Sequence, residues 1–242
     1  MSNIPLYFIC FVGSIIGLSL LVFHFRKRKR ANALRKLADT LGFSFTQKAQ
    51  FSLRESLKDS HLAKRGGKIL NVVHGISQNI DVTIFDHVVE VPAGIAGGNI
   101  KETIMVLRSN KLQLPHFVLE PKDFLKKVNL WADRAGVYLK KRLFSYWNRH
   151  YEHPRRELKS LEFNAYPVFS ERYLLRGIDE ERIRTCFNDA VLSYYSGFEG
   201  LVTEGAENRL IIYKQYGLVS PDDIQNFLSE GFGIFDLFKR DK

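Results

Sequence analysis

Residues 69–85 read ILNVVHGISQNIDVTIF, and this stretch decides the fold. Two runs rich in β-branched and apolar residues, 69–73 and 80–85, lie on either side of Gly75 and the polar residues 77–79. Such runs separated by a few turn-forming residues are typical of a β-hairpin. The stretch therefore predicts two antiparallel strands at the start of a sheet.

More strands and helices are predicted on the C-terminal side of this hairpin. Short strand patterns occur at 88–91, 103–107 and 117–119, and a second hairpin is predicted from 200–204 and 210–214. Helices are expected after Asp179, a good N-cap, and after Ser220-Pro221, which combines an N-cap with proline at the first helical position. The fold class that we predict is α+β, a mainly antiparallel sheet with helices packed on one face.

The N-terminal segment has a different character. Residues 4–25 read IPLYFICFVGSIIGLSLLVFHF, in which His24 is the only ionisable side chain. At about 1.5 Å per residue this run spans roughly 33 Å as a helix, enough for a bilayer core of about 30 Å. The sequence predicts a transmembrane helix within residues 1–25, preceded by a short outer N-terminus.

Five basic residues, 26–30, directly follow the apolar run. A cleaved signal peptide carries its charges before the apolar run, so we expect this segment to be retained. By the positive-inside rule the N-terminus faces outward, which makes the chain a single-pass protein of the inner membrane with a cytoplasmic C-terminal domain.

The remaining residues divide into a stalk and a domain. Residues 26–42 are predicted as a basic juxtamembrane stalk helix that ends at Gly42 and can continue the apolar helix. Residues 43–242 form the α+β domain, with 48–68 as a polar loop. Its candidate halves are 43–128 and 160–242, joined by a basic and aromatic segment at 129–159.

The formal charge of +10 comes from two places in the sequence. Residues 26–30 contribute five positive charges and residues 122–159 a balance of +7, so the rest of the chain sums to −2. A charge confined in this way is explained by anionic lipid or a protein partner, and nucleic acid is not expected as a partner of a tethered domain.

The basic segment has two interpretations. Its helical stripe of apolar and aromatic residues suits the surface of an anionic inner leaflet, and it equally suits a helix that packs on its own domain with a solvated basic face. The candidate contacts with a membrane surface or a partner are Arg26, Lys27, Arg28, Lys29, Arg30, Lys140, Lys141, Arg142, Trp147, Arg149, Arg155 and Arg156.

Gly13 and Gly17 form a small-xxx-small spacing that allows two helices to approach closely. The spacing is a hypothesis for helix dimerisation, and the alternative is that glycine is common in membrane helices.

No residue pattern in the sequence supports a specific reaction. We predict no catalytic residues, no cofactor and no metal site, because His150 and His153 lack the spacing and third ligand of a zinc motif. The alternative is a membrane-bound enzyme with a site near Asp86, His87 and His116, which are the acid and base candidates.

Several short pieces of the chain resemble a family of uncharacterised bacterial proteins that are anchored by a single membrane pass. The pieces are the N-terminal helix with its basic end, 33–42, 71–75, 84–86, 114–117 and 169–170. The resemblance implies a tethered cytoplasmic domain with no assigned activity. The function that we expect is a non-enzymatic module for contact with a membrane surface or a protein.

Overall fold

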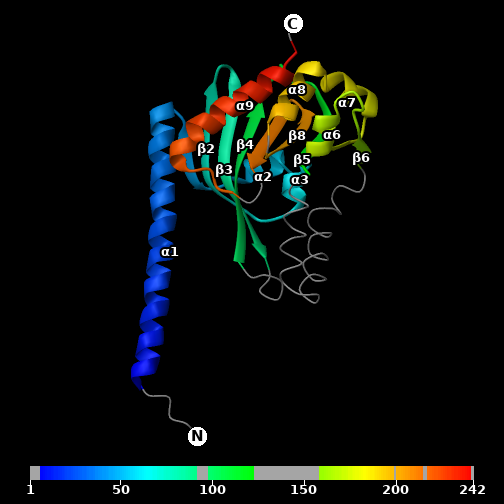
Figure 1. Cartoon of the computed structure of the whole chain (residues 1–242). Coiled ribbons are helices and arrows are strands. Elements are labelled where there is room, and N and C mark those ends of the chain that lie inside the picture. Colours follow the sequence, from blue (N-terminus) through cyan, green and yellow to red (C-terminus); the bar gives the residue numbers. More distant parts are fainter. Residues whose placement is uncertain (1–5, 92–97, 123–157, 199, 215–216, 241–242) are drawn as a thin grey trace, which may run out of the picture.

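The computed structural model describes residues 6–91, 98–122, 158–198, 200–214 and 217–240, without some of the side chains in 6–26 (Figure 1). In this part of the chain nine strands form one sheet in the order β1-β2-β3-β4-β9-β8-β5-β7-β6. The strands are β1 (Ser44–Lys48), β2 (Lys68–Ser77), β3 (Ile80–Val91), β4 (Gly98–Arg108), β5 (Leu114–Pro121), β6 (Lys159–Leu161), β7 (Tyr173–Gly177), β8 (Leu201–Glu207) and β9 (Arg209–Lys214).

The helices are distributed before and after these strands. They are α1 (Leu6–Leu41), α2 (Phe51–Ser56), α3 (His61–Lys64), α6 (Pro167–Arg172), α7 (Glu180–Cys186), α8 (Asp189–Gly197), the 3₁₀ turn η3 (Pro221–Asp223) and α9 (Ile224–Phe238).

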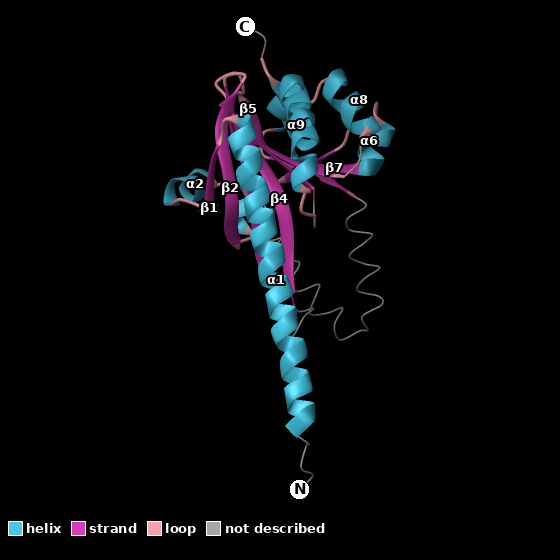
Figure 2. Cartoon of the chain, turned by 90° about the vertical axis from the view of Figure 1, so that its left-hand side faces the viewer, coloured by secondary structure: helices cyan, strands magenta, loops and turns pink. Residues whose placement is uncertain are grey.

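The predicted α+β class is confirmed, because the described strands pair antiparallel and the longer helices pack on one face of the sheet (Figure 2). β2 and β3 form the predicted hairpin, which closes between Ser77 and Ile80. Gln78 and Asn79 take left-handed φ angles of 54° and 61° at its turn. Asparagine tolerates this conformation better than most residues do.

The sheet joins strands from distant parts of the sequence. β5 lies between β8 and β7, and β9 lies beside β4. Strands that precede residues 123–157 and strands that follow them therefore belong to one sheet. In the second hairpin, β8 ends at Glu207 and β9 begins at Arg209. The first strand is therefore three residues longer than predicted, because the sequence pattern ended it at residue 204.

The main core lies between this sheet and the C-terminal helices. Phe117 of β5 packs with Phe187 and Phe238, and its ring occupies the space above Gly205 of β8. A Cβ on Gly205 would lie 2.2 Å from that ring, so glycine is required there. α9 closes this core, since its Gly231, Ile234, Phe235 and Phe238 are buried.

The other face of the sheet is covered in part by α2 and α3. The sequence pattern of 48–68 indicated a loop, whereas two short helices form there. Ser60 caps α3 by accepting a hydrogen bond from the backbone N–H of Ala63, and Leu57 and Leu62 bury their side chains. These two leucines hold residues 48–68 on the sheet, although this segment has no helical repeat of apolar residues long enough to predict a helix.

α1 corrects the prediction for the N-terminal segment. The apolar run and the basic run belong to one continuous helix of 36 residues, whose second half is charged and packs on the sheet through Ala31, Leu34 and Ala38. Within the described residues no helix qualifies, by length and apolar character, as one that could cross a membrane. The predicted single-pass transmembrane helix, on which the predicted inner-membrane location rested, is contradicted by this finding.

Candidate functional site

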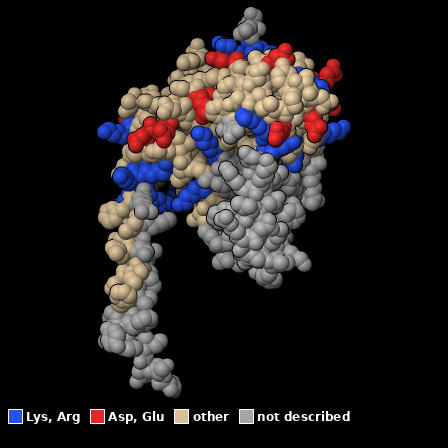
Figure 3. Space-filling view, in the orientation of Figure 1, with Lys and Arg blue, Asp and Glu red and all other residues tan. Residues whose placement is uncertain are grey.

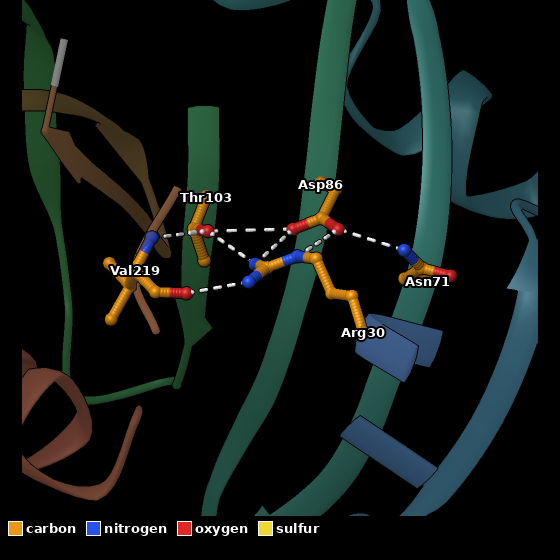
Figure 4. Close-up of polar contacts among 5 residues, drawn as sticks. All are labelled: Arg30, Asn71, Asp86, Thr103 and Val219. Atoms are coloured by element: carbon orange, nitrogen blue, oxygen red, sulfur yellow. Dashed lines mark hydrogen bonds and ion pairs between the residues drawn. The ribbon is translucent and has the colours of Figure 1, made fainter. Parts of the chain in front are cut away.

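A partly buried arginine joins α1 to the sheet and to the segment before η3. Arg30 donates from Nε to Asp86 Oδ2 at 2.8 Å and from Nη2 to Asp86 Oδ1 at 2.7 Å, which makes a bidentate ion pair (Figure 4). Nη2 also donates to Thr103 Oγ1 at 3.0 Å, and Nη1 donates to the backbone carbonyl of Val219 at 2.8 Å. Asn71 Nδ2 donates to Asp86 Oδ2 at 2.8 Å. We call these five residues the Arg30 clamp.

The local folds of four segments bring the clamp together. Asp86 and Thr103 are direct cross-strand partners in β3 and β4. Asn71 lies at a register shift in β2 and has a φ of 52°, a left-handed conformation that asparagine adopts more readily than most residues. Thr103 Oγ1 accepts a hydrogen bond from the N–H of Val219 at 2.9 Å, which holds residues 217–219 against the sheet.

The charged groups of Arg30 and Asp86 find their binding partners within the clamp. The Asp86 side chain is 5% exposed and that of Arg30 is 16% exposed, so water screens the pair little. Each carboxylate oxygen accepts from Arg30 and from a second side chain. The clamp therefore fixes the direction of α1 and leaves Asp86 no free oxygen for proton transfer.

A second charged cluster lies on the opposite face of the sheet, under α3. Arg65 Nη2 and Glu102 Oε2 form an ion pair at 2.8 Å, with the two side chains 1% and 0% exposed. The Arg65 guanidinium also lies over the ring of Tyr213. His87 Nε2 donates to the carbonyl oxygen of Gly66 at 2.7 Å. The other ring nitrogen, Nδ1, lies 3.7 Å from Glu102 Oε2. We call Arg65, Glu102 and His87 the buried charge cluster.

Glu204 holds the first turn of α3. One of its oxygens accepts from the backbone N–H groups of His61 and Leu62 at 3.0 and 3.4 Å, and the other accepts from Tyr213 Oη at 3.1 Å. His61 in turn stacks on the ring of His116 with centroids 5.2 Å apart. These contacts attach the short helix to the sheet, where its own hydrogen bonds are too few to hold it.

The stability of the fold is expected to decline at acidic pH in part through His116. Burial, together with Lys64 and Arg209, lowers the pKa of His116 below its ordinary value of 6.5. The folded state then binds this proton less readily than the unfolded state, so stability is full above pH 6.5 and falls as the pH drops below it. His116→Phe, which keeps a ring against His61, should reduce the decline in urea midpoint between pH 7.5 and pH 5.5. An equal decline in both proteins would contradict this assignment.

A shallow groove of about 280 Å³ lies between α2 and the β1 edge of the sheet. Its polar groups largely bind one another: Arg108 donates to Ser56 Oγ at 2.8 Å, and His74 Nδ1 lies 3.1 Å from Thr83 Oγ1. Desolvation lowers the pKa of the Arg108 guanidinium, against the effect of Asp81. The lining residues are Ser44, Thr46, Gln50, Ser52, Leu53, Ser56, Val72, His74, Thr83 and Arg108. The groove holds no pair of groups arranged for catalysis.

The N-terminal half of α1 extends away from the sheet (Figures 1 and 2). All side chains described between residues 11 and 29 are exposed, and contact with the domain begins at Arg30. Lys27, Arg28 and Lys29 are exposed where α1 meets the domain, and Figure 3 shows basic side chains gathered there. The exposed large hydrophobic side chains of this half are Phe11, Ile15, Leu18, Leu21, Val22 and Phe25.

The residues that the sequence proposed for contact separate into three groups. Lys27, Arg28 and Lys29 lie on the exposed surface, whereas Arg30 is turned inward and belongs to the clamp. Gly17 has open space around it. The surroundings of Gly13 and the side chain of Arg26 are not described. The remaining candidates lie outside the described residues: Lys140, Lys141, Arg142, Trp147, Arg149, Arg155 and Arg156.

The structure does not bring together the three residues named for an enzyme. Asp86 contacts Arg30 on the face that α1 covers, whereas His87, as the next residue of the same strand, lies on the face under α3. His116 is on the His87 face but stacks on His61. Within the described ranges, no three His, Cys, Asp or Glu side chains gather as ligands for a metal ion.

Sequence reasoning missed Arg65, Glu102 and Glu204. Glu102 directly precedes the largely apolar run Thr103 to Leu107, and Glu204 directly follows Leu201 to Thr203. A carboxylate at an inward-facing strand position needs a buried cation or backbone donors, and this requirement is the signal that was available.

Comparison with known proteins finds a solved structure with a similar fold. No family model and no curated protein matches the chain. Among solved structures, the crystal structure of the mycobacterial trehalose monomycolate transport factor A, TtfA, is similar, with a TM-score of 0.56 and 13% sequence identity over 87% of this chain and 94% of that chain. The resemblance noted in the sequence is not tested by this neighbour and stays a prediction. At 13% identity the likeness shows a shared fold alone.

Proposed function

We propose that the chain is a non-enzymatic protein-interaction module whose recognition surface is the N-terminal half of α1. One observation carries the proposal: six large hydrophobic side chains of this helix are 43–66% exposed, on a segment that extends beyond the domain. An exposed apolar surface of this extent on a folded protein marks a binding site for another molecule.

The attachment of α1 to the sheet supports the same function. The bidentate Arg30–Asp86 pair and the buried Ala31, Leu34 and Ala38 hold the second half of α1 on the sheet. The exposed half is therefore presented in one direction before any partner arrives. Such preorganisation reduces the conformational entropy that binding would cost.

The charged residues of the domain favour a binding role over a catalytic one. Asp86 and Glu102 are each paired with an arginine at 2.7–2.8 Å, and Glu204 accepts two backbone N–H groups. A general base needs an accessible lone pair within reach of its substrate. An enzyme built from Asp86, His87 and His116 has no support in this arrangement.

The proposal is tested by photo-crosslinking in the cells that make the protein. With p-benzoylphenylalanine at Leu18, which is 65% exposed, we expect a covalent adduct of one defined mass. The adduct should fall at least tenfold when Val22→Glu is added, because a carboxylate on the apolar surface must be desolvated on binding.

The matched control carries the same crosslinker at Ile178, which is 57% exposed between β7 and α7. This position lies off the proposed surface and should give no such adduct. Adducts of equal yield at positions 18 and 178, or none at position 18, would disprove the recognition surface.

A further inference from the structure

We infer that Arg108 and Arg209 form a binding site for the phosphate group of a small free ligand, beside the end of α2. The two arginines take no part in the α1 surface, so this site is independent of the proposed function. Four features point to it: the pairing of the arginines in the sheet, their shared contact with α2, the charge that remains around them and the groove beside them.

The two arginines are direct neighbours in the sheet. Arg108 is the last residue of β4, Arg209 is the first residue of β9, and the two are cross-strand partners. Side chains of cross-strand partners lie on the same face of a sheet, where like charges repel each other. Desolvation lowers the pKa of Arg108 and Arg209 lowers it further, against the effect of Asp81. Two positive charges are therefore held side by side at a cost in stability.

Both guanidinium groups contact Ser56, the last residue of α2. Arg108 Nη2 donates to Ser56 Oγ at 2.8 Å, and Arg209 Nη1 donates to the backbone carbonyl of Ser56. A guanidinium carries five N–H donors. Within the described part of the chain, the other N–H groups of these two guanidiniums have no hydrogen-bond partner. The pair is thus fixed in position and keeps donors for a ligand.

The carboxylates near the pair do not neutralise it. Asp81 Oδ1 lies 3.8 Å from Arg108 Nη1, too far for a hydrogen bond, and the Asp81 side chain is 40% exposed. Among the described residues no carboxylate forms an ion pair with Arg209, and Asp59, in the turn after α2, pairs with neither arginine. Two guanidiniums and one carboxylate leave an excess of one positive charge, which a bound anion would neutralise.

The groove between α2 and β1 suits a small polar ligand. Arg108 and Ser56 line it together with the hydroxyl groups of Ser44, Thr46 and Ser52, and no Asp or Glu is among its described lining residues. Its volume of about 280 Å³ is close to the lower limit of about 300 Å³ for small-molecule sites. The groove therefore has room for a small phosphorylated molecule whose phosphate lies at the arginine pair.

A phosphate fits the pair better than a carboxylate does. One guanidinium is sufficient for a carboxylate, since it binds both oxygens through two parallel hydrogen bonds. A phosphate monoester offers three acceptor oxygens and carries close to two negative charges at pH 7. Guanidiniums on two strands can each bind a different part of such a group, and their rigid donor geometry matches it.

Isothermal titration calorimetry of the full chain tests the site with inorganic phosphate, glycerol 3-phosphate and acetate at one ionic strength. We expect both phosphates to bind at least tenfold more tightly than acetate. Arg108→Gln and Arg209→Gln should each weaken phosphate binding at least tenfold. The matched control is Arg182→Gln, which removes an exposed arginine of α7 and should leave phosphate binding unchanged.

Hydrogen exchange of the unaltered chain tests the same site without a variant, in case a variant loses the fold. Saturating phosphate should slow amide exchange at least threefold in peptides that cover α2, because the ligand bridges this short helix to the sheet. Exchange in α7 should not change. Circular dichroism shows which variants retain the fold.

Four results would overturn the site. They are equal binding of acetate and phosphate, phosphate binding that both glutamine variants retain, unchanged exchange in α2, and a lipid source of the phosphate. The last is recognised with phosphatidylcholine vesicles that contain phosphatidic acid: the chain would bind these vesicles through Arg108 and Arg209 and would not bind glycerol 3-phosphate.

Discussion

Replacing Asp86 with alanine is expected to lower the free energy of unfolding by about 3 kcal/mol, the low end of the range for breaking a buried ion pair. Removal of the carboxylate leaves Arg30 bound, among the described residues, to Thr103 Oγ1 and the carbonyl of Val219, which are both uncharged. The side chain of Arg30 is 16% exposed, so part of the charge regains water. Urea titration of the full chain, followed by circular dichroism, measures the loss.

The control is an exposed pair on the same two strands. Lys68 and Glu90 join β2 and β3 as Asn71 and Asp86 do, but their side chains are 62% and 66% exposed. Exposed pairs contribute little because water and salt screen them, so Glu90→Ala should leave the free energy of unfolding nearly unchanged. If the two variants lose the same stability, the clamp does not hold α1 on the sheet.

The role of Arg30 shows what a local pattern reveals and where it misleads. In the sequence it is the last of five basic residues, and it was grouped with exposed contacts. Its position also shares a helical face with Leu34, Leu37, Ala38 and Leu41, at spacings of four, seven, eight and eleven residues. Helical periodicity would have placed Arg30 on the packed face, but the prediction grouped it by charge with its exposed neighbours. The partner of its charge, Asp86, lies 56 residues away and is not encoded in any local pattern.

Hairpins were predicted from the sequence because their contacts are local. The runs 69–73 and 80–85 specify β2 and β3 by alternation and by the turn between them. The pairing of β4 with β9, and the place of β5 between β8 and β7, depend on contacts between residues roughly 50 to 110 positions apart. No local spacing encodes them, so the sheet order could not be predicted.

The N-terminal helix shows the limit of composition as an argument. The apolar content of residues 4–25 was counted without the residues that continue the same helix. In the structure those residues are charged on one side and packed on the sheet on the other. The exposed hydrophobic side chains that the count detected are present on the N-terminal half of α1.

Glu102→Ala is expected to cost more than Asp86→Ala, about 4–5 kcal/mol of unfolding free energy. Both members of the Arg65–Glu102 pair are buried, at 1% and 0% exposure, so the remaining guanidinium cannot reach water without local opening. Urea titration of the full chain measures the loss beside that of Asp86→Ala.

A double variant separates the pair's charge from its packing. Arg65→Met, Glu102→Leu replaces both charges with apolar side chains of similar size, and most of the lost stability should return because both buried charges are removed together. Recovery of this kind would show that the pair is retained for the position of α3 rather than for stability. A loss below about 1 kcal/mol for Glu102→Ala would contradict the burial of the pair, since only solvent-screened ion pairs are worth so little. In that case Arg65 must reach water through an opening of the turn at Gly66 and Gly67. This turn connects α3 to β2, and both glycines have left-handed φ angles, 70° and 109°.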